Sequence, residues 1–176
     1  MHRQGPVRQK GGPGEAQATG RNPTDRGKPG TKRHLLTEAN ALPVALVVTG
    51  ANRHDMTQLA ALLDGTVVEP TPAAPPHLAL DRGYDYAACR EAAAARGYTA
   101  HIPPKASEAA PLPPPGHPDR HPPRRWVVEV AHSWFNRFRR LLTRTEKQAR
   151  HYLGFGHVAA VLIIYRKLRH ARLLSG

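Results

Sequence analysis

Two acidic side chains, Asp81 and Glu129, stand where a carboxylate could do chemistry in an otherwise basic chain. Asp81 ends the apolar run Leu78–Leu80 and precedes an Arg-Gly pair. In open α/β sheets functional groups gather at the carboxyl ends of strands, which is the position predicted for Asp81. The alternative is a turn or capping aspartate, although Asp85 is better placed to cap the helix that follows.

Glu129 lies in the segment RRWVVEVAHSWFNRFRRLLTR and is the only acid between Arg120 and Thr145. Apolar residues recur there at steps of three and four, which predicts a helix with one apolar stripe: Val127, Val130, Trp134, Phe138 and Leu141. Four polar residues share a face with Glu129 beside that stripe: Arg125, His132, Ser133 and Asn136. The alternative for Glu129 is a surface ion pair, which contributes little to stability.

Two carboxylates from distant segments of a basic chain suggest a divalent metal held for phosphoryl chemistry. Mg²⁺ prefers carboxylate oxygens and water as ligands. Two such ions can activate an attacking oxygen and stabilise the leaving oxygen of an in-line displacement. The cation also offsets the repulsion between clustered acids. Arg82 and Arg125 could then hold DNA phosphates through bidentate contacts.

The charge balance of the chain indicates a polyanionic partner. Lys and Arg number 26 against 13 Asp and Glu in 176 residues, which gives a formal net charge of +13. Neutralising phosphates releases counterions, so double-stranded DNA is the first candidate and an anionic membrane surface the second. The residues that we expect at DNA phosphates are Arg82, Arg125, Arg137, Arg139, Arg140, Lys32 and Arg33; for the arginines 137, 139 and 140 the alternative is a solvated face.

Cysteine usage and the length of the apolar runs indicate the cellular compartment of the chain. The single Cys89 excludes an internal disulfide and a cysteine-based zinc cage, which suits a reducing cytoplasm. The first residues are basic and Gly-rich, unlike a secretory signal. The longest apolar run, Val158–Tyr165, is shorter than the ~20 residues that span a bilayer. We therefore expect a cytoplasmic protein without a membrane partner.

The first half of the chain predicts an arm, a hairpin and a helix. Residues 1–30 are rich in Gly, Pro, Arg and Lys, which favours an extended or disordered arm. Two strands follow at Lys32–Thr37 and Pro43–Thr49, joined by a turn. A short helix comes next, with Asp55 as its N-cap and a buried face of Leu59, Leu62 and Leu63.

The second half predicts a strand at His77–Leu80, a helix over Tyr86–Arg96 capped by Asp85 and stopped by Gly97, and a short strand in YTAHIP. A Pro-rich loop at 103–123 follows. A long helix then begins near Arg124, and a last helix covers Leu153–Leu168. This order is typical of an α/β domain with a mixed sheet, part antiparallel and part parallel.

On five stretches the chain resembles the DDE class of bacterial insertion-sequence transposases, in the group of insertion sequence four and five. The stretches are GRNPTDRGKPGTKRHLL, PVALVVTGANRHDMTQLAALLD, LDRGYDY, RRWVVEVAHSWFNRFRRL and HVAAVLIIYRKL, and together they cover nearly all of Gly20–Leu168. The resemblance implies a ribonuclease-H-like mixed sheet flanked by helices, Mg²⁺ or Mn²⁺ as cofactor, and DNA cleavage and strand transfer at the ends of a mobile element. It makes Asp81 the second and Glu129 the third acid of the catalytic triad.

The chain departs from this family at the first acid of the triad. The family's first aspartate lies on the first strand, ahead of a Gly-rich segment that begins here near Gly11. No acid stands between Met1 and Gly14, and Glu15 and Asp25 lie in Pro/Gly-rich sequence. We therefore expect a partial catalytic domain over 31–176 that lacks its first strand and first aspartate. Beside the third acid, Pro122 and Asn136 replace a tyrosine and a lysine of some relatives.

Two functions follow from this departure. The first is a transposase that is truncated or is one product of two overlapping reading frames, as the resemblance implies for some elements. An upstream frame could then supply the missing aspartate, and the expected protein partners are that upstream-frame product or further copies of the chain. The alternative is a catalytically inactive DNA-binding remnant that occupies element ends. In both, we expect the chain in the bacterial cytoplasm, associated with the nucleoid, and with two of three acids we expect the isolated chain to be inactive.

Overall fold

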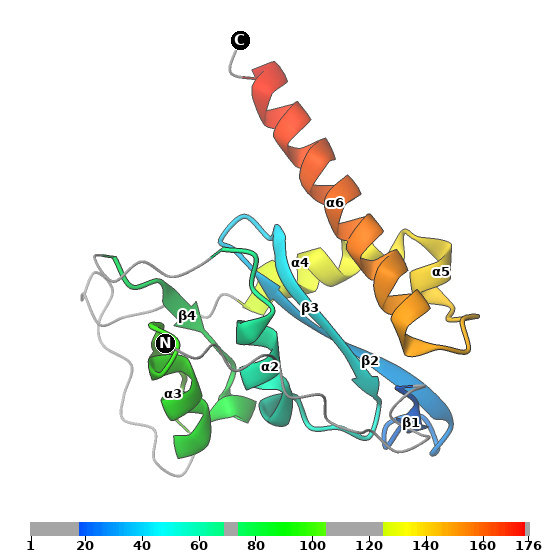
Figure 1. The fold of residues 1–176 in the computed structure, drawn as a ribbon, viewed down its shortest axis with the longest axis horizontal. Coiled ribbons are helices and arrows are strands. Elements are labelled where there is room, and N and C mark those ends of the chain that lie inside the picture. The colour runs from blue at the N-terminus through cyan, green and yellow to red at the C-terminus, as the bar shows by residue number, and fades with distance from the viewer. Residues whose placement is uncertain (1–17, 69–73, 105–124, 175–176) are drawn as a thin grey trace, which may run out of the picture.

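The computed structural model of the chain describes residues 18–68, 74–104 and 125–174 (Figure 1). Its strands are β1 (Gly20–Arg21), β2 (Pro29–Thr37), β3 (Pro43–Gly50), β4 (His77–Ala79) and β5 (Thr99–His101). Its helices are η1 (Asp55–Gln58), α2 (Leu59–Asp64), η2 (Arg82–Tyr84), α3 (Ala87–Ala94), α4 (Arg125–Asn136), α5 (Arg139–Leu142) and α6 (Ala149–Leu174), of which η1 and η2 are 3₁₀ helices. The mixed α/β class predicted from the sequence is confirmed.

The first sheet is antiparallel and has the order β1-β2-β3. β2 and β3 form the predicted hairpin, with Leu35 opposite Leu46 and Arg33 opposite Val48. The turn between them is organised by Glu38, whose carboxylate accepts hydrogen bonds from the backbone N–H groups of Asn40 and Leu42. Two short apolar runs, Leu35–Leu36 and Val44–Val48, with a polar turn between them therefore indicate this hairpin in the sequence.

The second sheet consists of β4 and β5, which run parallel and are joined by α3. Leu78 lies opposite Ala100 in the register of the two strands. Gly97, at a φ of +76°, ends the segment after α3, as predicted, because its left-handed backbone favours glycine. In the described part of the chain the antiparallel and parallel strands belong to two separate sheets rather than one.

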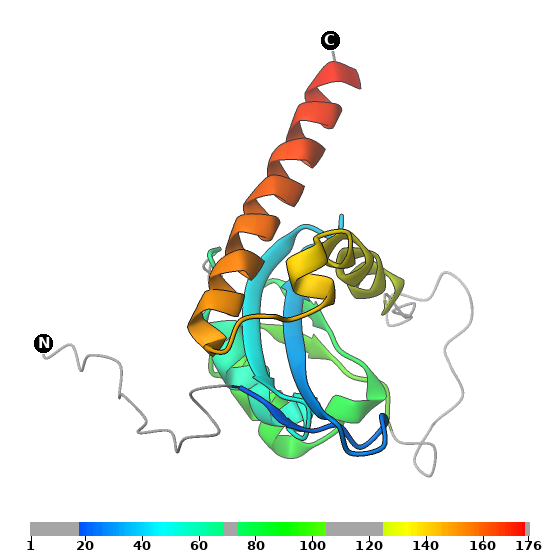
Figure 2. The ribbon, with the colours of Figure 1, turned by 90° about the vertical axis from the view of Figure 1, so that its right-hand side faces the viewer.

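The β2–β3 hairpin has a hydrophobic core on each face. Leu35 belongs to one cluster and its neighbour Leu36 packs against the other, because successive side chains of a strand point to opposite faces. The first cluster joins the hairpin to α4, α5 and α6 through Val127, Ala131, Phe135, Leu141, Tyr152, Ala159 and Ile163. The second joins it to α2, β4, α3 and the end of β5 through Leu59, Leu63, Leu78, Cys89, Ala93 and Ile102. Figure 2 shows α6 leaving this body and projecting well beyond it.

Three local predictions differ from the structure. The residue before η1 is His54, and Asp55 does not cap; its carboxylate contacts β2 instead. Tyr86 rather than Asp85 occupies the N-cap of α3, and Asp85 pairs with Arg90. The predicted long helix breaks after Asn136, because Phe138 has an extended backbone and starts α5.

The buried face of α4 is also shifted from the predicted stripe. The buried residues are Val127, Ala131 and Phe135, at steps of four, whereas Val130, Trp134 and Phe138 are only partly buried. The predicted arm differs over 18–30, where β1, a turn and the start of β2 are found. The rest of the arm and most of the Pro-rich loop lie outside the described residues.

Candidate active site

Asp81 follows β4 directly and its carboxylate is fixed by the backbone. Oδ1 accepts a hydrogen bond of 2.8 Å from the N–H of Gly83, so Asp81 caps η2. A Cβ at position 83 would lie 2.9 Å from this oxygen, so glycine leaves the room that the cap requires. The capping alternative is therefore the observed role of Asp81. The cap engages Oδ1 of Asp81 and thereby fixes the position of Oδ2.

Glu129 lies on α4 with an exposed side chain. The opposite face of α4 holds the helix in place, because Val127, Ala131 and Phe135 are buried against the hairpin. A polar contact adds to this packing: Arg33 on β2 donates a hydrogen bond to the Oδ1 of Asn136. The position of Glu129 is thus set by how α4 packs on β2.

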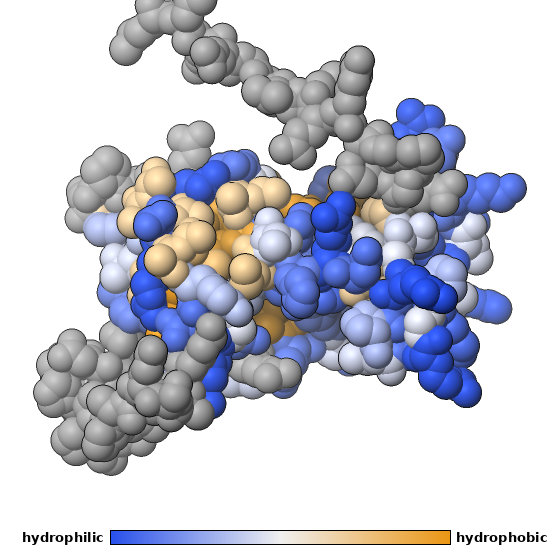
Figure 3. All heavy atoms as spheres, turned by 90° about the horizontal axis from the view of Figure 1, so that it is seen from below, coloured by the Kyte–Doolittle hydropathy of each residue, from blue (hydrophilic) through white to orange (hydrophobic). Residues whose placement is uncertain are grey.

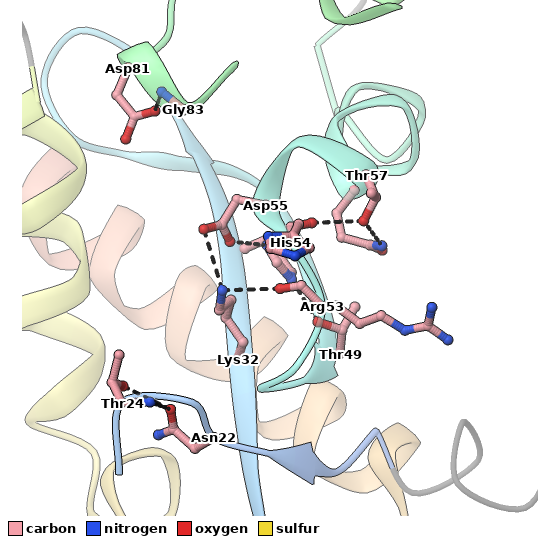
Figure 4. Close-up of polar contacts among 12 residues, drawn as sticks. Asn22, Thr24, Lys32, Thr49, Arg53, His54, Asp55, Thr57, Asp81 and Gly83 are labelled. Carbon is pink, nitrogen blue, oxygen red and sulfur yellow. Dashed lines mark hydrogen bonds and ion pairs between the residues drawn. The ribbon is translucent and has the colours of Figure 1, made fainter. Parts of the chain in front are cut away.

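Asp55 is the acid that joins η1 to the hairpin (Figure 4). Its Oδ1 lies 3.0 Å from Nδ1 of His34, and its Oδ2 lies 3.4 Å from Nζ of Lys32. His34 is buried, and its Nε2 lies 2.7 Å from the hydroxyl of Thr49. Since a carboxylate only accepts, Nδ1 of His34 carries the proton and the neutral ring accepts at Nε2. Lys32 also donates to the carbonyl of Arg53.

The charge of Asp55 reaches both neighbouring elements of the site. η1 packs against η2, and burial raises the pKa of the Tyr84 phenol, with the charges of Asp55 and Asp81 raising it further. On α4, burial lowers the pKa of His132, the nearby Arg33 lowers it too, and Asp55 opposes both. Burial likewise lowers the pKa of His34, against the effect of Asp55. The charge of Asp55 therefore acts on a titratable group of η2, which Asp81 caps, and on one of α4.

The described residues do not form a complete metal site. Carboxylate oxygens such as those of Asp81 and Glu129 suit Mg²⁺. Among the residues that the structure describes, however, no group of three or more His, Cys, Asp or Glu could hold a metal ion. Asp55 does not fill this gap, because both of its oxygens already contact Lys32 and His34.

Three of the predicted DNA-contacting cations are available at the surface. Arg82, Arg137 and Arg139 are exposed, and in the described part of the chain none of them is in an ion pair. Figure 3 shows hydrophilic side chains gathered on the side of β1 and α5, with apolar ones toward α3. The face of the molecule in this view is thus divided into a polar and an apolar region.

The other predicted cations have partners inside the molecule. Arg33 contacts Asn136, and its guanidinium lies over the ring of Phe135. Arg140 pairs with Glu146 at 3.0 Å. Lys32 is held by Asp55, as described above. The side chain of Arg125, the first residue of α4, lies outside the described part of the chain.

Comparisons with known proteins decide the family. The family described as "Transposase DDE domain" matches residues 5–164. The chain belongs to the DDE transposase family. It is 38% identical, over 158 residues, to the "Putative transposase for insertion sequence element IS402" of Burkholderia cepacia. That alignment covers 87% of this chain and 71% of the relative. No solved structure matches the chain significantly.

Membership in the transposase family agrees with the resemblance found in the sequence. It supports DNA as the partner and a divalent metal as the family's usual cofactor. Within the described residues, no helix of this transposase is long and apolar enough to cross a bilayer.

The Asp55 cluster is the feature of this transposase that sequence reasoning missed. Its signal was present in two places. The alternation of β2 places Lys32, His34 and Leu36 on one face, and a histidine on a face that also carries Leu36 needs a polar partner. The acid that follows β3 within five residues was available as that partner, but a helix cap was the nearer explanation.

Proposed function

We propose that this chain carries the DNA-cutting and strand-joining part of an insertion-sequence transposase, acting on phosphodiesters at the ends of its element. The observation that carries this proposal is Asp81, an acid at the carboxyl end of β4 whose orientation is fixed by Gly83. Functional groups gather at this position in α/β sheets. The attacking group is water in cleavage and a DNA 3′-hydroxyl in strand transfer, and each step exchanges one P–O bond for another.

Asp81 and Glu129 are the two acids that we propose as ligands of Mg²⁺ or Mn²⁺. When bound, such an ion supplies charge to stabilise the attacking and leaving oxygens. The chain's own contribution is orientation: Gly83 fixes the carboxylate of Asp81, and the packing of α4 fixes the backbone of Glu129. A third acid must come from outside the described residues, because these contain no group of three ligands.

DNA binding in this proposal uses Arg82, Arg137 and Arg139. What supports them is their exposure and their lack of an ion pair within the described part of the chain. Arginine forms bidentate contacts with phosphate oxygens. Arg82 directly follows Asp81, so a phosphate bound there would lie next to the acid.

A cleavage assay tests the enzymatic proposal. The substrate is duplex DNA that carries the element's terminal repeat, with Mg²⁺ or Mn²⁺ added, and the chain is assayed together with the polypeptide encoded immediately upstream, because the isolated chain is expected to be inactive. Nicking that disappears in Asp81→Ala and in Glu129→Gln is the expected result. Glu91→Gln, at an exposed acid of α3, is the matched control and should retain activity. Nicking by Asp81→Ala at the wild-type rate would reject the proposed role of Asp81.

A separate observation favours an incomplete catalytic domain, which either is completed by a partner or is inactive. In the described residues β4 pairs with β5 only, and β2 pairs beyond Gly30 with β3 only. Both strands nevertheless border one hydrophobic cluster, through Leu36 and Leu78. We propose that a strand bearing the first acid, from an upstream reading frame or another copy, pairs with these two edges and joins the sheets into a ribonuclease-H-like whole.

Trans-complementation distinguishes the completed enzyme from the inactive remnant. The polypeptide encoded immediately upstream would be co-expressed with this chain and assayed for nicking. Activity that appears only in the mixture, and is lost when the aspartate of the added strand becomes asparagine, supports completion in trans. Salt-sensitive DNA binding without nicking in either sample supports the remnant.

A further inference from the structure

The last helix, α6, packs along only part of its length. Its buried residues are Tyr152, Gly156, Ala159 and Ile163, which recur at steps of three and four and face β3 and α4. Beyond Ile163 the helix leaves the body and projects away from it, as both views show (Figures 1 and 2). On this projecting half residues 165–170 are exposed, and it contacts the body through Lys167, which reaches the ring of Trp134 on α4.

A second apolar stripe runs along the side of α6 that faces away from the body. Val158, Val161, Tyr165 and Leu168 are exposed by 58%, 65%, 60% and 52%, and Phe155 and Leu162 are each exposed by 38%. These six residues, here called the α6 stripe, also recur at steps of three and four. Phe155 lies at the end of the stripe nearest the body, where the guanidinium of Arg140 on α5 lies over its ring. A helix that is apolar on two opposite sides is typical of one that is covered on both. Proteins seldom leave such a continuous apolar surface in water.

The charges beside the α6 stripe are all positive. α6 contains no Asp or Glu between Ala149 and Leu174 and carries Arg150, Arg166, Lys167, Arg169 and Arg172. Lys167 is turned toward the body, where its ammonium lies 4.3 Å from the ring centroid of Trp134. Arg166 and Arg169 are exposed next to the stripe. A second copy of α6 would add like charges along the contact, whereas acidic side chains would pair with them.

We propose that the α6 stripe docks an amphipathic helix of a partner protein, with apolar residues on its contacting face and Asp or Glu along its flanks. Apolar burial would supply the affinity, and the cations of α6 would select the sign of the flanking charges. DNA cannot cover the stripe, because its phosphates offer no apolar surface. This surface is distinct from the acids proposed for catalysis and does not depend on them.

Two synthetic helical peptides test the proposal against the full-length chain. Both are about four heptads long with leucine at positions a and d; one has glutamate at e and g, and the other has lysine there. Binding is measured by fluorescence anisotropy at low and high salt. The glutamate peptide should bind at least about tenfold more tightly, because several opposite-charge pairs replace like-charge pairs, and added salt should reduce the difference.

Three variants of the chain locate the binding. Val161→Gln/Tyr165→Gln removes apolar surface from the stripe and should lose the glutamate peptide, while Val67→Gln, at a valine exposed by 79% outside α6, should bind as the wild type does. Arg166→Glu/Arg169→Glu should prefer the lysine peptide. The latter variant keeps the apolar stripe, so it tests the proposal even if the glutamine variant fails to fold.

Other occupants of the α6 stripe give different results. Dimers of the chain that Val161→Gln/Tyr165→Gln dissolves would assign the stripe to a second copy and overturn the proposal. Binding to anionic lipid vesicles that the same variant abolishes would assign it to a membrane surface. Equal affinity for the two peptides, or binding of neither, would also overturn it.

Discussion

At the scale of single residues, Asp55 shows how one carboxylate can organise a site without lying at its centre. It accepts from the buried His34 and pairs with Lys32, so it ties η1 to β2. A buried imidazole without an acceptor for its N–H would be costly. The same carboxylate is half exposed and fixes the position of Lys32, one of the cations predicted to contact DNA. The contacts of Asp55 therefore both stabilise the hairpin and fix the position of a lysine predicted to contact DNA.

Removing the carboxylate of Asp55 should destabilise the protein. Asp55→Ala leaves the buried Nδ1–H of His34 without its acceptor, and we expect a loss of about 1–3 kcal/mol in the free energy of unfolding. Asp25→Ala is the matched control: its ion pair with Lys28 is 3.7 Å long and exposed, so its loss should be below about 0.5 kcal/mol. Urea denaturation of both variants measures the difference. Equal stabilities would mean that the His34–Asp55 contact contributes nothing.

Stability should also fall in mild acid because of His34 and His132. Burial lowers both pKa values below the usual 6.5. The unfolded chain then binds protons more readily than the folded one, so the free energy of unfolding decreases as pH falls below about 6.5. His34→Asn keeps an N–H donor toward Asp55 but cannot titrate. Urea denaturation at about pH 7.5 and 5.5 should show a smaller decrease in the free energy of unfolding for this variant than for the wild type. An equal decrease in the two proteins would refute the role of His34.

At the scale of elements, α6 depends on how closely one glycine approaches β3. A Cβ added at Gly156 would collide with the side chain of Leu46, whereas Gly154, two residues earlier, has open space around it. The two glycines lie in the same helix, so their substitution by alanine brings the same gain in helix propensity. Only the packing differs.

Alanine at these two positions should therefore have different effects. Gly154→Ala should stabilise the protein by about 0.5–1 kcal/mol, because glycine in a helix costs conformational entropy. Gly156→Ala should be less stable than Gly154→Ala by about 1–3 kcal/mol, the usual cost of overpacking a core. Thermal melts of the pair give the comparison directly. If both variants gained stability equally, α6 would not pack closely on Leu46.

Elements with strong local patterns were predictable from the sequence, and those that depend on distant contacts were not. The β2–β3 hairpin follows from two short apolar runs joined by a polar turn, and the buried face of α2 follows from the spacing of its leucines. The break before Phe138 was missed, because a helical stripe continues through it in the sequence. The role of Asp55 was missed because its partners lie on β2, twenty or so residues away. The acids at 81 and 129 stay predictions as metal ligands.

At the scale of the whole molecule, the cations behind the net charge of +13 serve two different purposes. Some cations hold the fold together: Arg140 pairs with Glu146 and lies over the ring of Phe155, and Arg96 makes two hydrogen bonds to Asp64. Others, such as Arg137 and Arg139, are exposed and have no ion pair among the described residues. Only the second kind can exchange counterions for phosphates without first breaking an internal contact.

The salt dependence of DNA binding should separate these two kinds of arginine. Each phosphate contact releases counterions, so the slope of log affinity against log salt should fall in magnitude by about 0.9 for each contact that is lost. Arg137→Ala/Arg139→Ala should therefore reduce the slope by about two and weaken binding to any duplex alike, because phosphate contacts carry no sequence information. Arg140→Ala removes the same charge from a neighbouring position but breaks the pair with Glu146. It should lower the melting temperature and leave the slope unchanged. Fluorescence anisotropy across a salt series measures both quantities, and an equal change of slope in the two variants would show that exposure does not decide which arginines meet DNA.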